Sequence, residues 1–323
     1  KGLVLDLRDN PGGLLDVAVD VVEKFLPRGS SIVSTKGRKS DSEKKYTATE
    51  EPMLGDAALA VVVNKMSASA SEIVAGAIQD LDRGVIVGTQ TFGKGLVQTI
   101  LPLSYNTSLK VTTARYYTPS GRCIQELDYS RKGKGGAVQA IPDSLRREYQ
   151  TTHKRRVYEA GGILPDTIVT EDGQIQLMKE LIQKAMFFKY ATYYVSKHKT
   201  LPEDFEVNEA VLEEFKKYLQ EQQFKYQEDS ETKIAELKEI AQKENYGQSI
   251  LKDIDKVLKA VSEEKGNEFM RHGNEIKRAL AAELFSRYSG EAGRIRAGLK
   301  GDKQLRVAVL LLKNEAEYNR RLD

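Results

Sequence analysis

The sequence has very few of the residues that build disulfide scaffolds and metal centres. Cys123 is its only cysteine, so neither an internal disulfide nor a cysteine-rich metal cluster can form. The three histidines, His153, His198 and His272, are scattered, and no HExxH spacing occurs. A Ser-His-Asp triad would have to use one of these three, and His153 lies in the basic run 153–156, which we expect to be a solvated loop. The sequence therefore predicts no metal site and no cofactor.

Long apolar runs and a strong net charge are also missing. No apolar run reaches the roughly 20 residues of a membrane-spanning helix, so we expect no membrane span. Lys and Arg total 50 against 47 Asp and Glu, a net charge of +3, which argues against nucleic acid or an anionic membrane as a partner. The chain opens at Lys1, without Met or a signal peptide, directly into an apolar segment, which indicates a piece of a longer protein.

Apolar segments alternate with helical patterns in the first half of the chain. We expect strands at residues 3–7, 31–34, 57–63, 85–87 and 96–101, and a return to the same core at 162–169. Apolar residues recur at helical spacing from residue 14 until Pro27 and over residues 70–81. A chain of 323 residues is long enough for two domains. These features predict an α/β core with a largely parallel sheet.

The composition changes twice after this core. Residues 125–160 are polar and are expected to form an excursion outside the core. Beyond Asp172, long runs rich in Glu, Lys, Gln, Leu and Ala predict helices at 177–195, 211–240, 250–261, 279–288 and 307–322. We therefore expect a core domain over residues 1–172 and a helical domain over residues 173–323.

A serine-rich turn precedes the expected helix at 70–81. Ser69 and Glu72 have the spacing of a capping box, so one interpretation of Ser69 is an ordinary helix cap. The other is a nucleophile, because a serine at a helix N-terminus lies beside unpaired N–H groups that stabilise an oxyanion. The N–H of Ala70 would be one such donor.

Lys94 stands between two glycines, directly before an expected strand. It is either a surface lysine in a turn or a general base, which works in its neutral form and so predicts activity that falls as pH drops. If residues 94–98 are extended, Lys94 and Gln98 share one face, and the Gln98 amide could orient the lysine amine. The turn at Pro11 could supply a second oxyanion donor from the N–H of Gly12 or Gly13.

Two other functions fit parts of the sequence. Residues 88–94 match the phosphate-binding pattern GxxxxGK, but Gly95 stands where Ser or Thr is needed and a strand is expected where a helix should begin. A nucleotide-binding protein is therefore one alternative. A non-catalytic scaffold that assembles through its long helices is the other.

Several motifs together resemble a known family. They are LVLDLRDNPGG at 3–13, SASASEI at 67–73, TFGKGLVQ at 91–98, YYTPSGR at 116–122 and GGILPD at 161–166. In this order they resemble the C-terminal processing peptidases, or tail-specific proteases, which are serine-lysine peptidases with a crotonase-like (ClpP/crotonase) α/β core. The resemblance covers roughly the first half of the chain.

The resemblance implies a role for each matching residue. Ser69 corresponds to the nucleophile, Lys94 to the general base and Gln98 to the residue that orients it. Ala70 and Gly12, with Gly13 as the alternative, correspond to the oxyanion hole. The implied activity is cleavage of proteins near an accessible C-terminal tail, in the cell envelope or periplasm, without metal or cofactor. Such proteases normally carry an upstream PDZ domain, and none is present in this sequence. The helical part is expected to support self-association or a partner protein.

Overall fold

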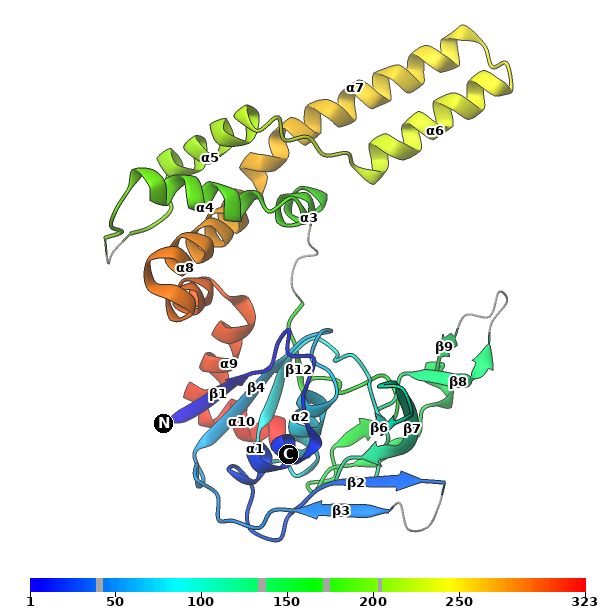
Figure 1. Cartoon of the computed structure of the whole chain (residues 1–323), viewed down its shortest axis with the longest axis vertical. Helices are drawn as coiled ribbons and strands as arrows, with labels where there is room; N and C mark the ends of the chain where they lie inside the picture. Colours follow the sequence, from blue (N-terminus) through cyan, green and yellow to red (C-terminus); the bar gives the residue numbers. More distant parts are fainter. Residues whose placement is uncertain (39–42, 133–137, 171–174, 203–204) are drawn as a thin grey trace. The chain divides into compact units, whose positions relative to one another are not determined.

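The chain divides into two compact units, each described here by itself (Figure 1). The computed structural model describes residues 1–38, 43–132, 138–170, 175–202 and 205–323. The first unit combines Lys1–Glu171 with Lys303–Asp323, and the second is Asp172–Asp302. The boundary expected between residues 172 and 173 lies outside the described residues.

The first unit contains most of the expected core elements. Those expected at 3–7, 31–34, 57–63, 85–87, 96–101 and 70–81 are confirmed with small shifts at their ends, whereas the first helix is shorter than expected. The strands are β1 (Gly2–Asp6), β2 (Ser31–Gly37), β3 (Lys44–Thr47), β4 (Ala58–Val63), β5 (Val85–Gly88), β6 (Leu96–Pro102), β7 (Ser108–Tyr117), β8 (Leu127–Lys132), β9 (Val138–Ala140), β10 (Glu148–Gln150), β11 (Arg156–Tyr158) and β12 (Thr167–Ile168). The helices are α1 (Leu15–Glu23), α2 (Ala70–Asp80), the short 3-10 helix η2 (Asp143–Leu145), α9 (Lys303–Lys313) and α10 (Glu315–Leu322).

A parallel sheet in the order β1-β4-β5-β12 forms the centre of this unit. Alternate residues of β4 point to opposite faces, as the two-residue period of a strand requires. Val61 and Val63 pack with buried residues of α1 and α2, whereas Ala60 and Val62 pack with Ala308 of α9 and residues of α10. The sheet is therefore covered by helices on both faces, as a parallel sheet needs.

The last helices return to the first unit, so the expected helical domain of residues 173–323 is too long. Figure 1 shows α9 and α10, in red, beside β1 and β4 of this unit. The Tyr318 hydroxyl accepts a hydrogen bond from the Leu59 N–H at 2.9 Å and donates one to the Leu59 carbonyl oxygen at 3.0 Å. The physical reason for the return is the apolar second face of the parallel sheet, which these helices bury.

A second, antiparallel sheet has the order β3-β2-β7-β6, so the strand expected at 96–101 does not join the parallel sheet. β6 is an edge strand, and its pairing with β7 is irregular between Val97 and Gln98. The bulge lies at the end of β6 that borders the candidate site.

The polar segment 125–160 does not stay wholly outside the core. It contains the strand pairs β8-β9 and β10-β11, while residues 133–137 lie outside the described ranges. Arg155 forms ion pairs with Asp82 at 2.7 Å and Asp166 at 2.6 Å, and Val157 is buried. The expectation of a solvated loop at 153–156 is therefore wrong for Arg155.

The second unit is helical, but its helices are divided differently from the expectation. They are α3 (Gln176–Gln183), α4 (Met186–Lys197), α5 (Glu209–Glu221), α6 (Asp229–Lys243), α7 (Gln248–Arg271) and α8 (Gly273–Leu299). Left-handed backbone at Ala185 (φ 54°) separates α3 from α4, and Gln223 (φ 52°) lies in the break between α5 and α6. In the first unit, Asn314 begins α10 and divides the helix expected at 307–322. Tyr190 and Phe215 are fully buried in the hydrophobic core of the second unit. Within the described ranges, no helix is long and apolar enough to cross a membrane.

Candidate active site

One cavity of about 290 Å³ in the first unit collects most of the residues singled out from the sequence. Ser69 and Ala70 line it from the start of α2, Lys94 from the loop before β6, Gln98 from β6 itself, and Gly13 from the loop after β1. Further lining comes from apolar residues and two polar ones: Leu14, Leu15, Ile73, Leu96, Val97, Ile100, Lys110 and Tyr116. The fold therefore brings together three segments that are far apart in the sequence.

Ser69 differs from the two serines beside it in how its hydroxyl is used. Ser67 Oγ donates to the Leu7 carbonyl oxygen at 2.8 Å, and Ser71 Oγ donates to the Asn10 carbonyl oxygen at 3.0 Å. Both hydroxyls hold the turn against the loop after β1. Of these three serines, only Ser69 lines the cavity.

The backbone of Ser69 has an uncommon conformation for a residue with a side chain. Its φ is 56° and its ψ is −113°, and such angles persist only where surrounding contacts enforce them. The Ser69 hydroxyl is within capping-box reach of the Glu72 N–H, but that N–H donates to the Ser69 carbonyl oxygen at 2.9 Å. The hydroxyl makes no capping hydrogen bond and is available to the cavity.

The carboxylate of Glu72 connects the serine turn to the lysine loop. Its Oε1 accepts hydrogen bonds from Thr91 Oγ1 and the Gly93 N–H, both at 2.6 Å. Its Oε2 accepts from the Ser69 N–H at 2.8 Å and the Lys94 N–H at 2.9 Å. Glu72 therefore fixes the backbone of both Ser69 and Lys94.

Burial raises the pKa of Glu72 above its ordinary value, while the four donors act in the opposite direction. The side chain is 0% exposed. Thr91 Oγ1 also accepts from the Ile163 N–H at 2.7 Å, so its own proton points to Glu72. From the sequence, Glu72 was identified only as the second residue of a capping box. Its spacing of three residues from Ser69 was the one signal that pointed to it.

Lys94 and Gln98 lie on the cavity wall without being joined. Lys94 is half-buried and Gln98 is exposed. Within the described part of the chain, no hydrogen bond joins the Lys94 ammonium to Ser69 or to Gln98. Strand β6 follows the lysine where a phosphate-binding loop would need a helix, so the nucleotide-binding alternative is not favoured.

Two backbone N–H groups of cavity-lining residues have no described acceptor. Neither Ala70 N nor Gly13 N donates a hydrogen bond to a described residue, and both residues line the cavity. The N–H of Gly12 is different, because it donates to Asn10 Oδ1 at 2.9 Å. Of the two glycines expected as the second donor, Gly13 is therefore the one whose N–H has no described acceptor.

Tyr116 is a second residue of the site that sequence reasoning missed. It is 3% exposed, and its hydroxyl makes no hydrogen bond to a described residue. Burial raises the pKa of Tyr116 well above its ordinary value, and the nearby Ser69 side chain acts in the opposite direction. The cavity therefore holds a neutral phenol beside Ser69.

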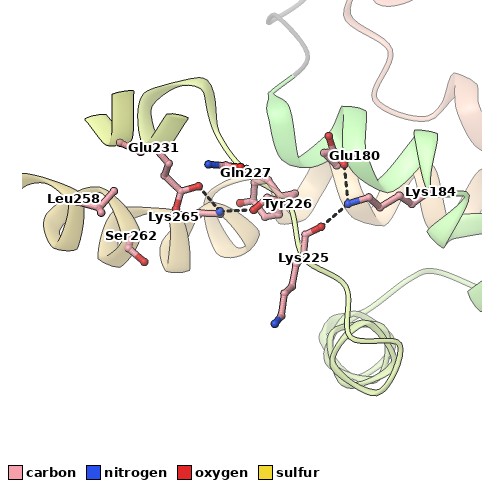
Figure 2. A pocket seen from close by; sticks show the side chains of 10 residues that line it. Glu180, Lys184, Lys225, Tyr226, Gln227, Glu231, Leu258, Ser262 and Lys265 are labelled. Carbon is pink, nitrogen blue, oxygen red and sulfur yellow. Dashed lines mark hydrogen bonds and ion pairs between the residues drawn. The ribbon is translucent and has the colours of Figure 1, made fainter. Parts of the chain in front are cut away.

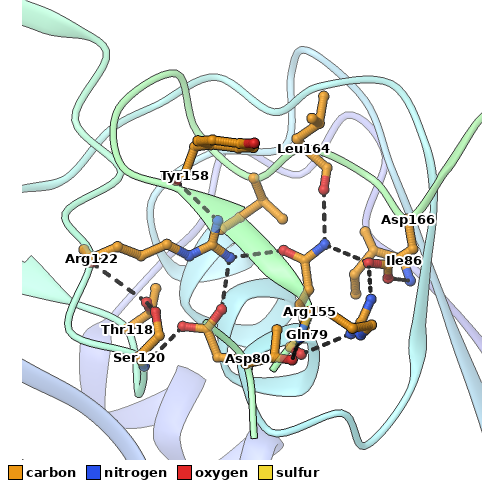
Figure 3. Close-up of polar contacts among 12 residues, drawn as sticks. Gln79, Asp80, Ile86, Thr118, Ser120, Arg122, Arg155, Tyr158, Leu164 and Asp166 are labelled. Carbon is orange, nitrogen blue, oxygen red and sulfur yellow. Dashed lines mark hydrogen bonds and ion pairs between the residues drawn. The ribbon is translucent and has the colours of Figure 1, made fainter. Parts of the chain in front are cut away.

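A buried polar network fixes the far end of α2 (Figure 3). Arg122 is 1% exposed and forms an ion pair with Asp80 at 2.8 Å, and it also donates to Gln79 Oε1 at 2.8 Å. Gln79 in turn donates to Asp166 Oδ1 at 2.8 Å. The network explains why Arg122 closes the YYTPSGR motif and shows how the helix that carries Ser69 is held at both ends.

A larger hollow of about 730 Å³ lies in the helical unit and has different chemistry (Figure 2). Lys265 Nζ donates to Glu231 Oε2 and to the Tyr226 carbonyl oxygen, both at 2.6 Å. Lys184 pairs with Glu180 at 2.9 Å. These lysines bind backbone and carboxylate groups of the unit itself. Across the described ranges, no group of three His, Cys, Asp or Glu side chains could hold a metal ion.

Two protein families match separate parts of the chain. Residues 1–130 match peptidase family S41, and residues 177–312 match the probable PDZ-protease C-terminal helical domain. The fold is accordingly that of an S41 peptidase with an additional C-terminal helical domain. The second match begins at residue 177, shortly after the break between the compact units, and its last residues lie in α9 of the first unit.

Known proteins similar to this chain are C-terminal processing proteases. The carboxy-terminal-processing protease of Bartonella bacilliformis is 56% identical over 125 residues, which are 39% of this chain and 29% of that protein. The corresponding protease of Synechocystis sp. is 47% identical over 126 residues, again 39% and 29%. The solved photosystem II D1 C-terminal processing protease is 34% identical over 52% of this chain and 34% of its own, with a TM-score of 0.38. The chain thus spans under a third of the curated relatives' length.

Proposed function

We propose that the chain carries the catalytic core of a serine endopeptidase that cleaves proteins near their C-terminus, because residues 1–130 match peptidase family S41. The observation that carries the proposal is the shared cavity, which is lined by Ser69, Lys94 and two free N–H groups. A nucleophile, a base and oxyanion donors are the parts that acyl transfer requires.

In the proposed mechanism, neutral Lys94 Nζ takes the proton of Ser69 Oγ as this oxygen bonds to the scissile carbonyl carbon. The N–H groups of Ala70 and Gly13 stabilise the oxyanion. The C–N bond then breaks, and the Lys94 ammonium gives its proton to the leaving amine. Water attacks the remaining ester, Lys94 takes the proton of the water, and Ser69 Oγ regains it. No metal or cofactor takes part.

Gln98 is the proposed orienting residue for Lys94. Both side chains line the same cavity, and the bulge next to Gln98 lets it border the site. A residue that only orients the base contributes less than the base itself, so we expect Gln98→Ala to reduce kcat about tenfold.

The first experiment replaces the nucleophile and the base in the protein that carries this chain. We expect Ser69→Ala and Lys94→Ala each to lower kcat by at least about 1,000-fold on a substrate with an unstructured C-terminal tail. Lys65→Ala is the matched control in the same turn, because the Lys65 side chain is exposed and does not line the cavity. Undiminished cleavage by either Ser69→Ala or Lys94→Ala would refute the assignment.

Three further points extend the proposal. We assign the first unit a crotonase-like fold, supported by its helix-covered parallel sheet and its second, antiparallel sheet. The family resemblance supports a location in the cell envelope, in the periplasm, which fractionation would test.

A role of the helical unit in self-association or partner binding is supported by exposed apolar residues of α6 and α7, such as Leu237, Ile240 and Val257. Chromatography of variants with polar residues at these positions would test that role.

A further inference from the structure

A second hollow continues the catalytic cavity along the antiparallel sheet. It measures about 570 Å³ and shares two wall residues, Leu96 and Gln98, with the cavity that contains Ser69. Its remaining lining includes three cationic side chains, Lys36, Arg38 and Arg115. The basic hollow and the catalytic cavity are therefore neighbours on the same strand, β6.

The strand register places two of the three cations, Lys36 and Arg115, directly opposite each other. Arg115 on β7 is the cross-strand partner of Leu96 on β6 and of Lys36 on β2. Lys36 also lies over the Tyr117 ring, 5.4 Å from its centre. Like charges that face each other directly across two strands destabilise a sheet. The Lys36–Arg115 pair therefore has a cost that packing does not explain.

The three cations have no acidic partner in the described part of the chain. Neither Lys36, Arg38 nor Arg115 lies within ion-pair distance of a described carboxylate, and all three side chains are exposed. Exposed lysines elsewhere do have such partners, including Lys238 with Asp255 at 2.5 Å. Because the net charge is only +3, this concentration of unpaired positive charge is local.

We propose that the basic hollow binds an acidic side chain, Asp or Glu, of the polypeptide whose scissile bond lies at Ser69. The inference rests on the proposed function and adds a substrate preference to it. The occupant is proposed to be part of the substrate because the hollow borders the catalytic cavity, with Leu96 and Gln98 lining both. The guanidinium of Arg115 matches a carboxylate in shape and charge.

The register also sets where the acidic residue falls. Neighbouring strands are about 4.8 Å apart, so Lys36 lies about 10 Å from Leu96 across the sheet. An extended peptide spans that distance in roughly three residues. The acidic side chain is therefore expected two to four residues from the scissile bond.

The test compares peptides that differ by one charge. A series carries a single Glu, or Gln as its neutral counterpart, at each position within about five residues of the scissile bond. We expect Glu to raise kcat/KM roughly tenfold over Gln at one or two of these positions, and the preference to shrink as salt is added. In Lys36→Gln/Arg115→Gln the preference should disappear, while cleavage of the Gln peptide stays within about twofold.

The matched control is Lys45→Gln, which removes an exposed lysine from the edge strand β3 of the same sheet, away from both hollows. It should keep the full preference for Glu. A preference unchanged in the double variant, or lost equally in the control, would overturn the inference. So would a preference that depends only on a free C-terminal carboxylate and vanishes when that terminus is amidated.

Binding measurements separate this inference from the proposed function. In a Ser69→Ala background, fluorescence anisotropy should show the Glu peptide binding about tenfold more tightly than the Gln peptide, and the double variant should abolish the difference. This result would support the basic hollow even if Ser69 were not the nucleophile. Equal binding of the two peptides, together with normal cleavage by the wild type, would overturn the hollow and leave the proposed function intact.

Discussion

At the scale of single residues, Glu72 is what relates Ser69 to Lys94. Both backbone N–H groups donate to the same carboxylate oxygen of Glu72, at 2.8 and 2.9 Å. A group that binds two segments in this way sets their spacing without touching a substrate. Glu72 is thus a positioning residue in the proposed mechanism.

Replacing Glu72 with Gln should lower both stability and activity. The amide nitrogen of Gln cannot accept a hydrogen bond, so at least one buried donor loses its partner, at a cost of about 1–3 kcal/mol in the free energy of unfolding. Because the spacing of Ser69 and Lys94 then relaxes, kcat should fall about 100-fold with a smaller change in KM. Urea unfolding and steady-state kinetics measure the two effects.

Glu231→Gln is a matched control for Glu72→Gln. Glu231 has the same capping-box position in α6, where its Oε2 accepts from the Glu228 N–H at 2.9 Å. The Glu231→Gln substitution should lower the free energy of unfolding by about 1 kcal/mol and leave cleavage unchanged. Equal kcat in wild type and Glu72→Gln would contradict the positioning role.

The raised pKa of Glu72 also predicts how stability depends on pH. The folded protein keeps the Glu72 proton to a higher pH than the unfolded chain does, whose value is near 4.5. Folding therefore binds a proton in this window, and the contribution of Glu72 to stability falls as pH rises from 4.5 through the raised pKa. Glu72→Gln lacks this slope. Urea unfolding at several pH values in this window should show that the free energy of unfolding falls more steeply with pH in wild type than in Glu72→Gln. Parallel pH dependences of the two proteins would contradict the assignment.

At the scale of elements, the loop after β1 is fitted to the serine turn. The Asn10 carbonyl oxygen accepts from the Ala68 N–H and from Ser71 Oγ, both at 3.0 Å. Gly12, with φ of 96°, lies so close that a Cβ would be 2.5 Å from the Ala68 carbonyl oxygen and 2.7 Å from Ala70 N. Close approach of two backbones is what glycine allows here.

Gly12→Ala should therefore disrupt the site through a steric clash. We expect a loss of at least about 2 kcal/mol in the free energy of unfolding and a large drop in kcat, because the turn at Ser69 and Ala70 must move. Gly29→Ala is the matched control, since Gly29 has φ of 87° but nothing within 4 Å of its Cβ position. It should lose only about 1 kcal/mol, from backbone strain. Equal effects of the two substitutions would show that the clash is unimportant.

Local patterns were enough to place most elements of the first unit. Strand β4 and helix α2 were predictable because a continuous apolar run and the capping sequence are encoded over a few neighbouring residues. The motifs also pointed to Ser69, Lys94 and Gln98, which line one cavity. The role of Glu72 was hidden, because its donors come partly from Gly93 and Lys94, which meet it only in the folded chain.

The predicted helix boundaries were wrong where a single residue with left-handed backbone interrupts the apolar pattern. Apolar spacing continues through Ala185 and Gln223, but both adopt left-handed backbone that ends a helix. The sequence likewise gave no local sign that Ala308 and Tyr318 pack against the parallel sheet. Such long-range packing depends on an exposed apolar face elsewhere, which no single segment reveals.

At the scale of the whole molecule, the end of the chain completes the unit that contains Ser69. Buried residues of α9 and α10 pack against the face of the parallel sheet opposite to α1 and α2. Gln304 links these helices to the loop near the site, because it accepts from Arg8 NH1 at 3.2 Å and donates to the Val169 carbonyl oxygen at 2.8 Å.

Removing residues 303–323 should therefore destabilise the catalytic unit rather than the helical unit. Truncation exposes the apolar face around Val62 and Val87, and we expect loss of the cooperative unfolding of the first unit, with aggregation. Tyr318→Phe is the milder variant, which removes two hydrogen bonds to Leu59 and should cost about 1–3 kcal/mol. A truncated chain that unfolds like the wild type would contradict this packing role.

The most direct test of the central claim is covalent labelling of the nucleophile. A serine-directed fluorophosphonate, followed by peptide mapping with mass spectrometry, should give one adduct, on Ser69. Because Lys94 is the proposed base, labelling should be about 100-fold slower in Lys94→Ala than in wild type or in the Lys65→Ala control. An adduct on another residue, or a wild-type labelling rate in Lys94→Ala, would contradict the account.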